Sequence, residues 1–452
     1  MSCFKAYDIR GAVPEELNAD LAWRIGRAYA AQLHPKDVAV GRDVRLSSPE
    51  LCRALTEGLL EGGVDVHDLG VCGTEEMYFA TFSQGFDGGI AITGSHNPAN
   101  CNGLKLVQRG AVPISGDSGL HALRDLVLSG TLPAPAATRG TRTEGNFREA
   151  YLRHLLGYID VAALTPLSIV ANPGNGCAGP VVEMLSKHLP FHIHFVHNEP
   201  DGTFPNGVPN PLLPECREAT ATAVVTAKAD LGIAWDGDCD RCFFFDETGT
   251  FIEGYYLVGL LAESILARHP GGKIIHDPRL SWNTIEMVRA AGGVPIESKT
   301  GHAFIKERMR AEDAVYGGEM SAHHYFRDFA YCDSGMIPWL LLTSLLCASK
   351  RPLSDLVRER IQAYPCSGEI NRKVDNADKA MAVVQKHFAP TAQGEDHIDG
   401  LSMDFGTWRF NLRRSNTENL LRLNVESRGD GPLMTTRTQE ILSIIDACAA
   451  GS

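Results

Sequence analysis

The sequence lacks the features of membrane-spanning, exported and nucleic-acid-binding proteins. Its longest apolar stretch, residues 335–348, contains Pro338 and is shorter than a membrane span, so it predicts a buried helix. The N-terminal residues do not combine a basic region with an apolar core, so we expect no export. The net charge of −13 provides no global positive field for nucleic acid or an anionic membrane. We therefore expect a cytoplasmic protein with neither type of partner.

A regular cysteine spacing is also missing. The twelve cysteines are scattered from Cys3 to Cys448, and several lie in apolar runs, as small buried thiols do. The one Cys-x-x-Cys, formed by Cys239 and Cys242, has no second pair at zinc-binding spacing. The pattern predicts a reduced protein and favours an incidental Cys-x-x-Cys over a metal or redox role.

The composition is otherwise that of an ordinary globular chain. Hydrophobic residues make up 44% and charged residues 21% of the 452 residues, without an excess of Gly or Pro. At about 100–200 residues per domain, this length suggests about two to four domains.

The hydrophobic pattern changes along the chain. As far as about residue 350, short apolar runs alternate with helix-length segments, which predicts α/β layers with largely parallel strands. The expected strands are residues 38–40, 89–93, 167–171, 231–235 and 273–276. Farther on, apolar and polar residues alternate as in half-exposed antiparallel strands, at residues 369–374, 397–404, 407–412 and 420–425. A smaller α+β domain is therefore expected last.

Turn-rich segments mark the expected domain boundaries. Residues 129–142 are rich in Pro, Gly, Ala and Thr, and Asp246-Glu-Thr-Gly249 is a turn between two apolar runs. We expect α/β domains at residues 1–143, 144–249 and 250–360, and the α+β domain at residues 361–452.

Three aspartates directly follow the expected strand at residues 231–235, in Asp236-Gly-Asp-Cys-Asp-Arg241. Open α/β sheets bind ligands at the carboxyl ends of their strands, and alternate side chains of an extended segment lie on one side. Asp236, Asp238 and Asp240 can therefore converge on one cation, and three hard oxygen ligands favour Mg²⁺ over zinc. The alternative is a solvated acidic turn, although carboxylates this close repel each other unless a cation compensates them.

A second polar motif, Thr93-Gly-Ser-His-Asn-Pro98, follows the apolar run Ile90-Ala-Ile92. It places the hydroxyl of Ser95 beside the imidazole of His96, so Ser95 is a candidate nucleophile or phosphoryl carrier. The simpler interpretation is an ordinary turn in which Ser and Asn bond their own backbone. The Gly-x-Ser-x-Gly elbow of acyl-transfer hydrolases is absent, so a reactive Ser95 fits phosphoryl chemistry beside the aspartates better.

Two further motifs carry groups suited to phosphate and sugar binding. Arg413-Arg-Ser-Asn-Thr-Glu418 combines guanidinium, hydroxyl and amide donors in one loop, the groups that hold a phosphate dianion. Gly317-Gly-Glu-Met-Ser-Ala-His-His324 offers a carboxylate, a hydroxyl and two imidazoles for sugar hydroxyls and proton transfer. A charged surface turn and structural histidines are the respective alternatives.

Two patterns favour structural over functional interpretations. Gly174-Asn-Gly-Cys-Ala-Gly179 matches the dinucleotide-binding Gly-x-Gly-x-x-Gly, but the acidic residues that follow, Glu199 and Asp201, lie in a Pro/Gly-rich loop. His192-x-His194-x-x-His197 is typical of one half-exposed strand face rather than of a metal site. A P-loop motif is absent, which disfavours an ATPase of that class.

Taken in order, the four polar motifs and the N-terminal Lys5-Ala-Tyr-Asp-Ile-Arg-Gly11 resemble the α-D-phosphohexomutase family over essentially the whole chain. Within that family, Gly-Glu-Met-Ser with residues 276–284 and 298–302 is most similar to bacterial phosphomannomutases of GDP-mannose and surface-polysaccharide pathways. The resemblance implies four domains around a central cleft, three related α/β domains with mixed sheets and a C-terminal α+β domain with an antiparallel sheet. It also implies an isomerase that interconverts mannose 6-phosphate and mannose 1-phosphate through phospho-Ser95, with a hexose 1,6-bisphosphate as intermediate and activator.

The resemblance further implies the site residues. The catalytic residues would be Ser95, His96, Lys105, Arg10 and His323, the last a candidate proton carrier. Mg²⁺ would be held by Asp236, Asp238, Asp240 and a phosphoserine oxygen on Ser95. The substrate would be bound by Tyr7, Arg241, Arg279, His302, Glu319, Ser321, Arg413, Ser415, Asn416 and Thr417.

The sequence departs from the family pattern at three positions, none of which removes a proposed catalytic group. Gly94 stands where Ala is common and is expected to loosen the serine loop. Cys239 stands where many members have Gly, and Asn419 replaces a Pro, which would make the phosphate loop more mobile.

Other activities stay open at this point. Enzymes of the same fold acting on glucose or glucosamine phosphates are the nearest alternatives, because epimers differ at one hydroxyl. A phosphosugar-binding protein without turnover is an alternative of another class. Both a monomer and a homodimer are compatible with the sequence.

Overall fold

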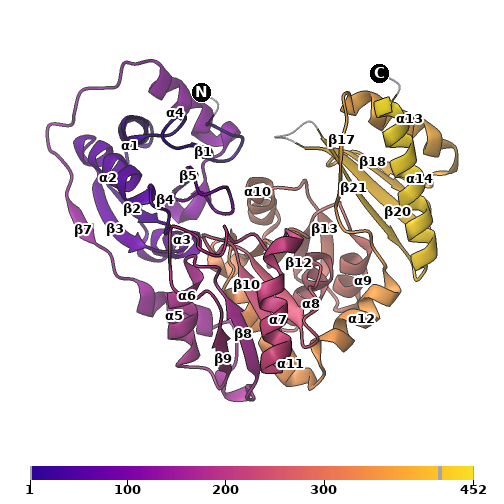
Figure 1. The fold of residues 1–452 in the computed structure, drawn as a ribbon. Helices are drawn as coiled ribbons and strands as arrows, with labels where there is room; N and C mark the ends of the chain where they lie inside the picture. The colour runs from indigo at the N-terminus through magenta and orange to yellow at the C-terminus, as the bar shows by residue number, and fades with distance from the viewer. Residues whose placement is uncertain (1–2, 416–419, 451–452) are drawn as a thin grey trace. The chain divides into compact units, whose positions relative to one another are not determined.

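The computed structural model describes residues 3–415 and 420–450, and the chain divides into two compact units, whose elements are drawn in Figure 1. Unit 1 consists of Met1–Phe251 and His323–Lys350, and unit 2 of Ile252–Ala322 and Arg351–Ser452. The chain therefore enters unit 2 twice. Each unit is described by itself below.

Unit 1 begins with a seven-stranded mixed sheet in the order β1-β5-β4-β2-β3-β7, with β6 beside β5. β2 pairs in parallel with β3 and β4, whereas β5 pairs antiparallel with β1 and β4. The sheet is thus mixed, with parallel pairs from β4 to β7 and antiparallel pairs at the β5 edge. The strands are β1 (Ile9–Ala12), β2 (Asp37–Arg42), β3 (Asp65–Val71), β4 (Gly88–Ile92), β5 (Cys101–Gln108), β6 (Val112–Pro113) and β7 (Arg142–Glu144).

Four helices accompany this sheet, α1 (Ala19–Leu33), α2 (Ser48–Glu61), α3 (Thr74–Gln84) and α4 (His121–Leu128). α1 begins after Asn18, whose Oδ1 accepts a hydrogen bond from Leu21 N at 3.0 Å and caps the helix. Apolar residues of α1, α2, α4 and the sheet form one buried core, which includes Ile25, Leu55 and Ile90. Burial of this apolar surface is the main stabilising contribution to the layered arrangement.

A second sheet in unit 1 has the order β11-β10-β8-β9. β8 (Ser168–Asn172), β9 (His192–Phe195) and β10 (Leu231–Trp235) are parallel, and β11 (Cys242–Asp246) is antiparallel to β10. The helices of this region are α5 (Arg148–Leu156), α6 (Ala178–Ser186) and α7 (Glu218–Ala227). β10 is buried along its whole length, so the loop that follows it starts inside the protein.

The second segment of unit 1 contains the antiparallel pair β15 (His324–Phe326) and β16 (Cys332–Asp333), followed by α11 (Ile337–Ser349). Ser334 Oγ accepts hydrogen bonds from Met336 N at 3.1 Å and Ile337 N at 3.0 Å, which starts the helix. α11 is mostly buried, so the prediction of a buried helix in this apolar stretch is confirmed.

In the described residues of both units, no helix is long and apolar enough to cross a membrane.

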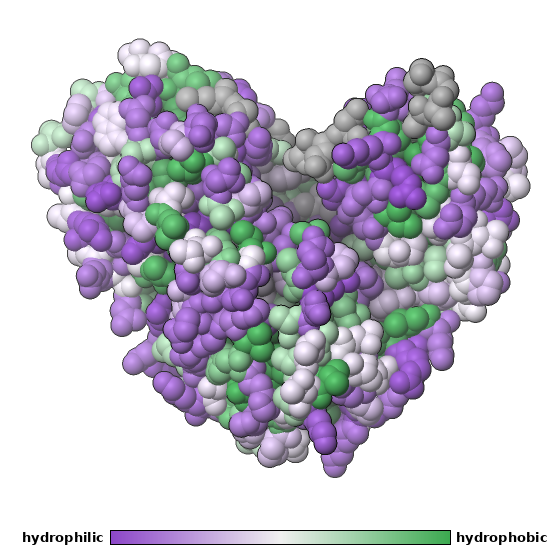
Figure 2. Space-filling view, viewed as in Figure 1, coloured by the Kyte–Doolittle hydropathy of each residue, from purple (hydrophilic) through white to green (hydrophobic). Residues whose placement is uncertain are grey.

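On the face shown in Figure 2, hydrophobic residues are interspersed with hydrophilic ones. All twelve cysteines are free thiols.

Unit 2 contains the parallel strands β12 (Lys273–His276), β13 (Val294–Glu297) and β14 (Tyr316–Gly318), with β12 in the middle. The helices that accompany them are α8 (Gly254–Leu266), α9 (Trp282–Ala290), α10 (His302–Glu312) and α12 (Leu353–Ala363). α8 is buried on nearly every side, as expected for a helix with so few charged residues.

The rest of unit 2 is an antiparallel sheet in the order β17-β21-β20-β19-β18, with two helices, seen in yellow and orange in Figure 1. Its elements are β17 (Ile370–Lys373), α13 (Ala377–Phe388), β18 (Gly394–Asp396), β19 (Leu401–Asp404), β20 (Trp408–Arg414), β21 (Leu420–Ser427) and α14 (Gly431–Ala450). Aromatic rings fill its core, where Phe405 and Trp408 stack with centroids 4.1 Å apart. The predicted fold class, α/β with a C-terminal antiparallel sheet, is confirmed.

One feature of this sheet contradicts the sequence pattern. β20 and β21 are buried on both faces rather than half-exposed, although polar residues alternate along them. The polar side chains are satisfied inside the protein: Arg409 Nη1 lies 2.8 Å from Glu426 Oε1, and Asn411 Nδ2 donates to Ser402 Oγ at 3.0 Å.

Candidate active site

Ser95 lies on a tight turn immediately after β4, where the sequence places it. Its backbone is left-handed, with a φ of 49°, and its N–H donates to Thr93 Oγ1 at 2.8 Å. The preceding Gly94 N donates to Asp43 Oδ2 at 3.0 Å. Side-chain acceptors therefore fix the backbone of the turn on which the candidate nucleophile stands.

The buried Arg45 fastens this serine loop from behind. Its guanidinium donates to four backbone carbonyl oxygens, those of Ser95 at 2.9 Å, Asn97 at 2.5 Å, Pro98 at 2.6 Å and Cys101 at 2.8 Å. A Cβ on Gly94 would lie 2.5 Å from Arg45 Cζ, so the loop and the guanidinium are in close contact. The expectation that Gly94 loosens the loop stays a prediction.

Asp236, Asp238 and Asp240 converge as the alternation along an extended segment predicts. One carboxylate oxygen of each lies within 4.8 Å of the others, and all three side chains are buried. Cys239 between them has a left-handed backbone, with a φ of 62°, and its Sγ lies 3.7 Å from Glu75 Oε1. Burial raises the pKa of the Cys239 thiol well above its usual range, so this thiol is protonated.

Two cationic side chains pair with these carboxylates. Lys105 Nζ lies 2.7 Å from Asp238 Oδ2 and 2.5 Å from Asp240 Oδ2. Arg241 Nη2 donates to Asp236 Oδ2 at 2.8 Å. Lys105 and Arg241 thus supply part of the positive charge that compensates the aspartates. An added cation does not have to supply all of it, as the sequence argument assumed.

The donor set nevertheless fits a divalent cation. Asp238 Oδ1 and Asp240 Oδ1 are buried and accept no hydrogen bond from the described part of the chain. Buried carboxylate oxygens without a partner are costly, and an oxygen-only set of ligands suits Mg²⁺. Burial alone would raise the pKa of Asp240, but Lys105, His323 and Arg241 outweigh it and hold this pKa well below its usual range, so Asp240 is ionised.

The hydroxyl of Ser95 contacts a carboxylate and an imidazole. Ser95 Oγ donates to Asp236 Oδ2 at 2.9 Å and lies 3.0 Å from His96 Nδ1. Burial raises the pKa of Asp236 to about 6, although Arg241 opposes this shift. Burial and the charges of Arg241 and Arg10 hold the pKa of His96 well below its usual range, so this imidazole is neutral.

The other residues expected in this half of the site are in unit 1 as well. Arg10 donates to Asn97 Oδ1 at 3.1 Å and to Asp8 Oδ2 at 2.6 Å, which places it at the serine loop. His323 Nε2 lies 3.9 Å from Asp240 Oδ1. Tyr7 is half-buried in the segment before β1. Serine, aspartates, lysine, arginines and imidazoles thus form one cluster from segments far apart in the chain.

Unit 2 brings together a second polar cluster around Arg279. This buried guanidinium donates to Asp277 Oδ2 at 2.8 Å and to Ser321 Oγ at 3.4 Å, and lies 3.7 Å from Glu319. Glu319 Oε1 in turn accepts from Gly301 N at 3.0 Å, beside His302, the first residue of α10. Carboxylate, hydroxyl and guanidinium groups suited to sugar hydroxyls are therefore adjacent.

Glu369 is a member of this cluster that the sequence motifs did not indicate. Its carboxylate lies 3.5 Å from Arg279, 3.0 Å from Arg413 and 3.2 Å from Arg422. Burial and the charge of Arg279 lower the pKa of Arg413, although the carboxylate of Glu369 opposes this shift. Glu369 thus gathers guanidinium groups at one place, and guanidinium groups are well suited to bind an anion such as phosphate.

Ser415 follows β20, and its N–H donates to Leu420 O at 3.0 Å. The remaining residues expected to bind phosphate, Asn416 and Thr417, lie outside the described residues, as does Asn419.

The glycine-rich segment after β8 supports the aspartate loop. Cys177 N donates to Gly237 O at 3.1 Å, and a Cβ on Gly176 would lie 2.7 Å from the same carbonyl oxygen. The glycines thus permit close approach of two backbones. In the described residues, the groups able to hold a metal are Asp236, Asp238 and Asp240, and Asp240, His323 and Asp333.

Four domain models of one family match the chain in order. The phosphoglucomutase/phosphomannomutase α/β/α domain I matches residues 1–131, domain II residues 149–249, domain III residues 253–364, and the C-terminal domain residues 369–443. The domain boundaries near residues 143, 249 and 360 stay predictions.

Individual proteins are similar over the full length. A Salmonella typhimurium protein named phosphomannomutase is 61% identical over 452 residues, which cover 99% of each chain. A Xanthomonas campestris pv. campestris protein named phosphohexose mutases is 61% identical over 447 residues, covering 98% of this chain and 99% of the other. The crystal structure of a Burkholderia thailandensis phosphoglucomutase/phosphomannomutase family protein is 32% identical with a TM-score of 0.89, covering 100% of this chain and 98% of the other.

Proposed function

Because the chain belongs to the phosphoglucomutase/phosphomannomutase family of α-D-phosphohexomutases, we propose that it is a phosphomannomutase that interconverts mannose 6-phosphate and mannose 1-phosphate. The observation that carries this proposal is the contact of Ser95 Oγ with Asp236 Oδ2 at 2.9 Å, inside a carboxylate cluster that fits a divalent cation. A serine that is to exchange a phosphoryl group needs compensating charge at that place.

In the proposed reaction, Ser95 carries a phosphoryl group that it passes to the free hydroxyl of a mannose phosphate. The P–O bond at Ser95 breaks and a P–O bond to the sugar oxygen forms. The sugar hydroxyl proton moves to a nearby base, for which His323 is the candidate. The resulting mannose 1,6-bisphosphate reorients and returns its other phosphoryl group to Ser95. A hexose 1,6-bisphosphate therefore also acts as the activator that phosphorylates Ser95.

The unit 1 residues position and stabilise this exchange. Mg²⁺, held by Asp236, Asp238, Asp240 and a phosphoserine oxygen, would neutralise the charge of the transferring phosphoryl group when bound. As its P–O bond breaks, Ser95 Oγ takes up a proton, and the hydroxyl then donates to Asp236 Oδ2, as it does at 2.9 Å in the structure. Positive charge near the transferring phosphoryl group would come from Lys105, Arg10 and Arg241. We place His96 and Tyr7 beside the serine loop as further residues that contact the substrate or the phosphoserine.

The unit 2 residues bind the substrate. Arg413, Ser415, Asn416 and Thr417 would hold the phosphate that is not being transferred, with Arg413 and Arg422 sharing Glu369 until the phosphate arrives. Glu319 and Ser321 would accept and donate hydrogen bonds to sugar hydroxyls, while Arg279 orients both. His302 lies next to Gly301, whose N–H donates to Glu319 at 3.0 Å.

A mutase that also acts on glucose phosphates is the nearest alternative. Two relatives of equal identity to this chain are named phosphomannomutase and phosphohexose mutases. Phosphorus NMR of an equal mixture of mannose 1-phosphate and glucose 1-phosphate, with Mg²⁺ and a trace of hexose 1,6-bisphosphate, decides it. We expect mannose 6-phosphate to form faster. Equal rates would indicate a dual-specificity enzyme. If neither 6-phosphate formed, a glucosamine phosphate mutase or a non-catalytic phosphosugar-binding protein would replace the proposal.

Arg45 gives a prediction about positioning. In Arg45→Lys, the ammonium cannot reach the four carbonyl oxygens that the guanidinium holds, so the serine loop shifts. We expect phosphosugar turnover to fall about 100-fold, the loss that a small misplacement of a reacting group causes. Steady-state kinetics measure this, with Arg24→Lys as control, because Arg24 is an exposed partner of Asp20. Turnover within about twofold of the parent enzyme would contradict the assignment.

A further inference from the structure

The first turn of α3 lies directly against the aspartate loop. Thr74, the first residue of the helix, is buried, and its N–H donates to the backbone oxygen of Asp238 at 2.9 Å. Its side-chain Oγ1 donates to Asp238 Oδ2 at 2.6 Å. Neither the sequence motifs nor the family resemblance pointed to this threonine.

The two donors to the Asp238 carboxylate choose the same oxygen. Thr74 Oγ1 and Lys105 Nζ both contact Oδ2, at 2.6 and 2.7 Å. Oδ1, also buried, accepts no hydrogen bond from the described residues. The hydroxyl of Thr74 thus fixes the rotation of the carboxylate and leaves one oxygen available.

Thr74 is itself held from two sides by residues of α3 and α5. Glu76 Oε1 accepts from Gly73 N at 3.1 Å, closing the start of the helix, and Glu76 Oε2 accepts from Arg148 Nε at 2.9 Å. On the other side of the turn, Tyr151 Oη donates to Glu75 Oε1 at 2.5 Å. The turn is therefore braced against α5, and Thr74 has little freedom to follow a moving carboxylate.

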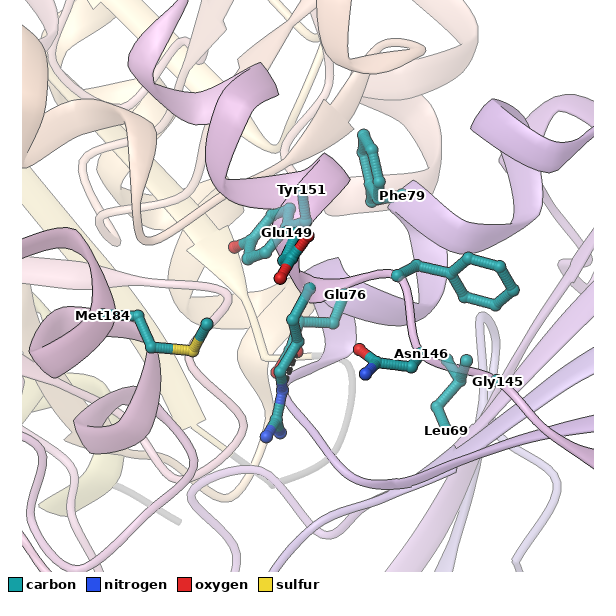
Figure 3. Close-up of a pocket in the computed structure, with 10 residues that line it drawn as sticks. Leu69, Glu76, Phe79, Gly145, Asn146, Glu149, Tyr151 and Met184 are labelled. Atoms are coloured by element: carbon teal, nitrogen blue, oxygen red, sulfur yellow. Dashed lines mark hydrogen bonds and ion pairs between the residues drawn. The ribbon is translucent and has the colours of Figure 1, made fainter. Parts of the chain in front are cut away.

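Figure 3 shows two of these bracing side chains on the wall of a cavity of about 390 Å³. Glu76 and Tyr151 lie there together with apolar side chains, among them Leu69, Phe79 and Met184. Glu76 and Tyr151 are themselves buried, at 7% and 1% exposed, so the hydrogen bonds of the brace are little exposed to water.

We propose that Thr74 is a positioning residue of the cation site, whose hydroxyl orients Asp238 so that Oδ1 is presented to the cation. The inference rests on the proposed function, since it assumes that the aspartates hold a divalent cation. Partners that orient metal ligands without touching the metal contribute about 10- to 100-fold to metal affinity. A threonine suits this role because its β-branch restricts rotation of the hydroxyl.

The test is the affinity of the full-length protein for Mn²⁺, measured by electron paramagnetic resonance of the free ion. Thr74→Val keeps the shape and removes the hydroxyl, so we expect Mn²⁺ to bind at least about 10-fold more weakly. Thr74→Ser keeps the hydroxyl, and its affinity should stay within about threefold of the parent protein. Thermal unfolding without metal checks that both variants are folded.

A third variant separates this inference from the proposed function. Asp238→Asn removes a proposed ligand charge and should abolish tight Mn²⁺ binding. If Asp238→Asn weakens binding but Thr74→Val does not, the positioning role is wrong while the cation site stands. If Thr74→Ser is as weak as Thr74→Val, the hydroxyl is not responsible and the positioning role is again wrong. If Asp238→Asn binds Mn²⁺ like the parent protein, both the cation site and the role of Thr74 are wrong.

Discussion

Replacing Ser95 by alanine is expected to lower phosphosugar turnover by at least about 1,000-fold, because the residue that carries the phosphoryl group is removed. The surrounding charges would remain, since Asp236 keeps its contacts with Arg241. Substrate affinity should therefore change much less than turnover. Coupled steady-state kinetics measure the loss, and calorimetric titration with mannose 1-phosphate measures the affinity.

The control for this variant is Ser83→Ala, which changes an exposed serine on α3. Incubation of the parent protein with hexose 1,6-bisphosphate should add one phosphoryl group, detected by intact-protein mass spectrometry and located at Ser95 by peptide mapping. Ser83→Ala should be phosphorylated and active, and Ser95→Ala neither. An Ser95→Ala protein that retained turnover would exclude the phosphoserine mechanism.

The second large effect is expected on stability, at Glu426 in the middle of β21. Its carboxylate is fully buried and accepts hydrogen bonds from Arg409 Nη1 at 2.8 Å, from Ser281 N at 2.8 Å and from the Tyr255 hydroxyl. Glu426→Gln would leave the buried guanidinium of Arg409 without its charge partner. Removing one member of a buried ion pair costs about 3–5 kcal/mol.

Hydrogen exchange is the suitable measurement, because a chain with several domains does not unfold in one step. We expect peptides covering β20 and β21 to exchange about 100-fold faster in Glu426→Gln, corresponding to about 3 kcal/mol. Glu395→Gln is the matched control, since Glu395 pairs with His397 at the surface and such pairs contribute about 0–1 kcal/mol. Equal exchange in the two variants would show that the Glu426 network is not stabilising.

The same network explains where sequence reasoning failed for the fold. The alternation of apolar and polar residues in β20 and β21 indicated one solvated face. The polar residues of that face, among them Arg409 and Glu426, instead pair with each other and with the loop before α9. A periodic pattern shows that one face of a strand is polar. It cannot show whether its polar groups form hydrogen bonds with water or with other protein groups.

For the candidate site, the sequence indicated the serine and aspartate loops but not the residues from other segments that hold the site residues in place. Ser95 and the three aspartates were found because polar motifs directly follow apolar strands, a relation that is local in the chain. Arg45, Thr74 and Glu369 reach the site only through tertiary packing, and Thr74 is separated by 164 positions from the aspartate that it contacts. A lone arginine or threonine has no local pattern that distinguishes a supporting role from an exposed one.

The discontinuity of unit 1 has a consequence for synthesis on the ribosome. Residues 252–322 of unit 2 are made before His323–Lys350 of unit 1. At 5–20 residues per second, synthesis of residues 252–322 takes roughly 4 to 14 s. Until then, the indole of Trp235 lacks its acceptor, Gly335 O, and the apolar surface later covered by α11 stays open. Nascent chains stalled before His323 should therefore be the ones that chaperones retain, and those extended past Lys350 the ones they release.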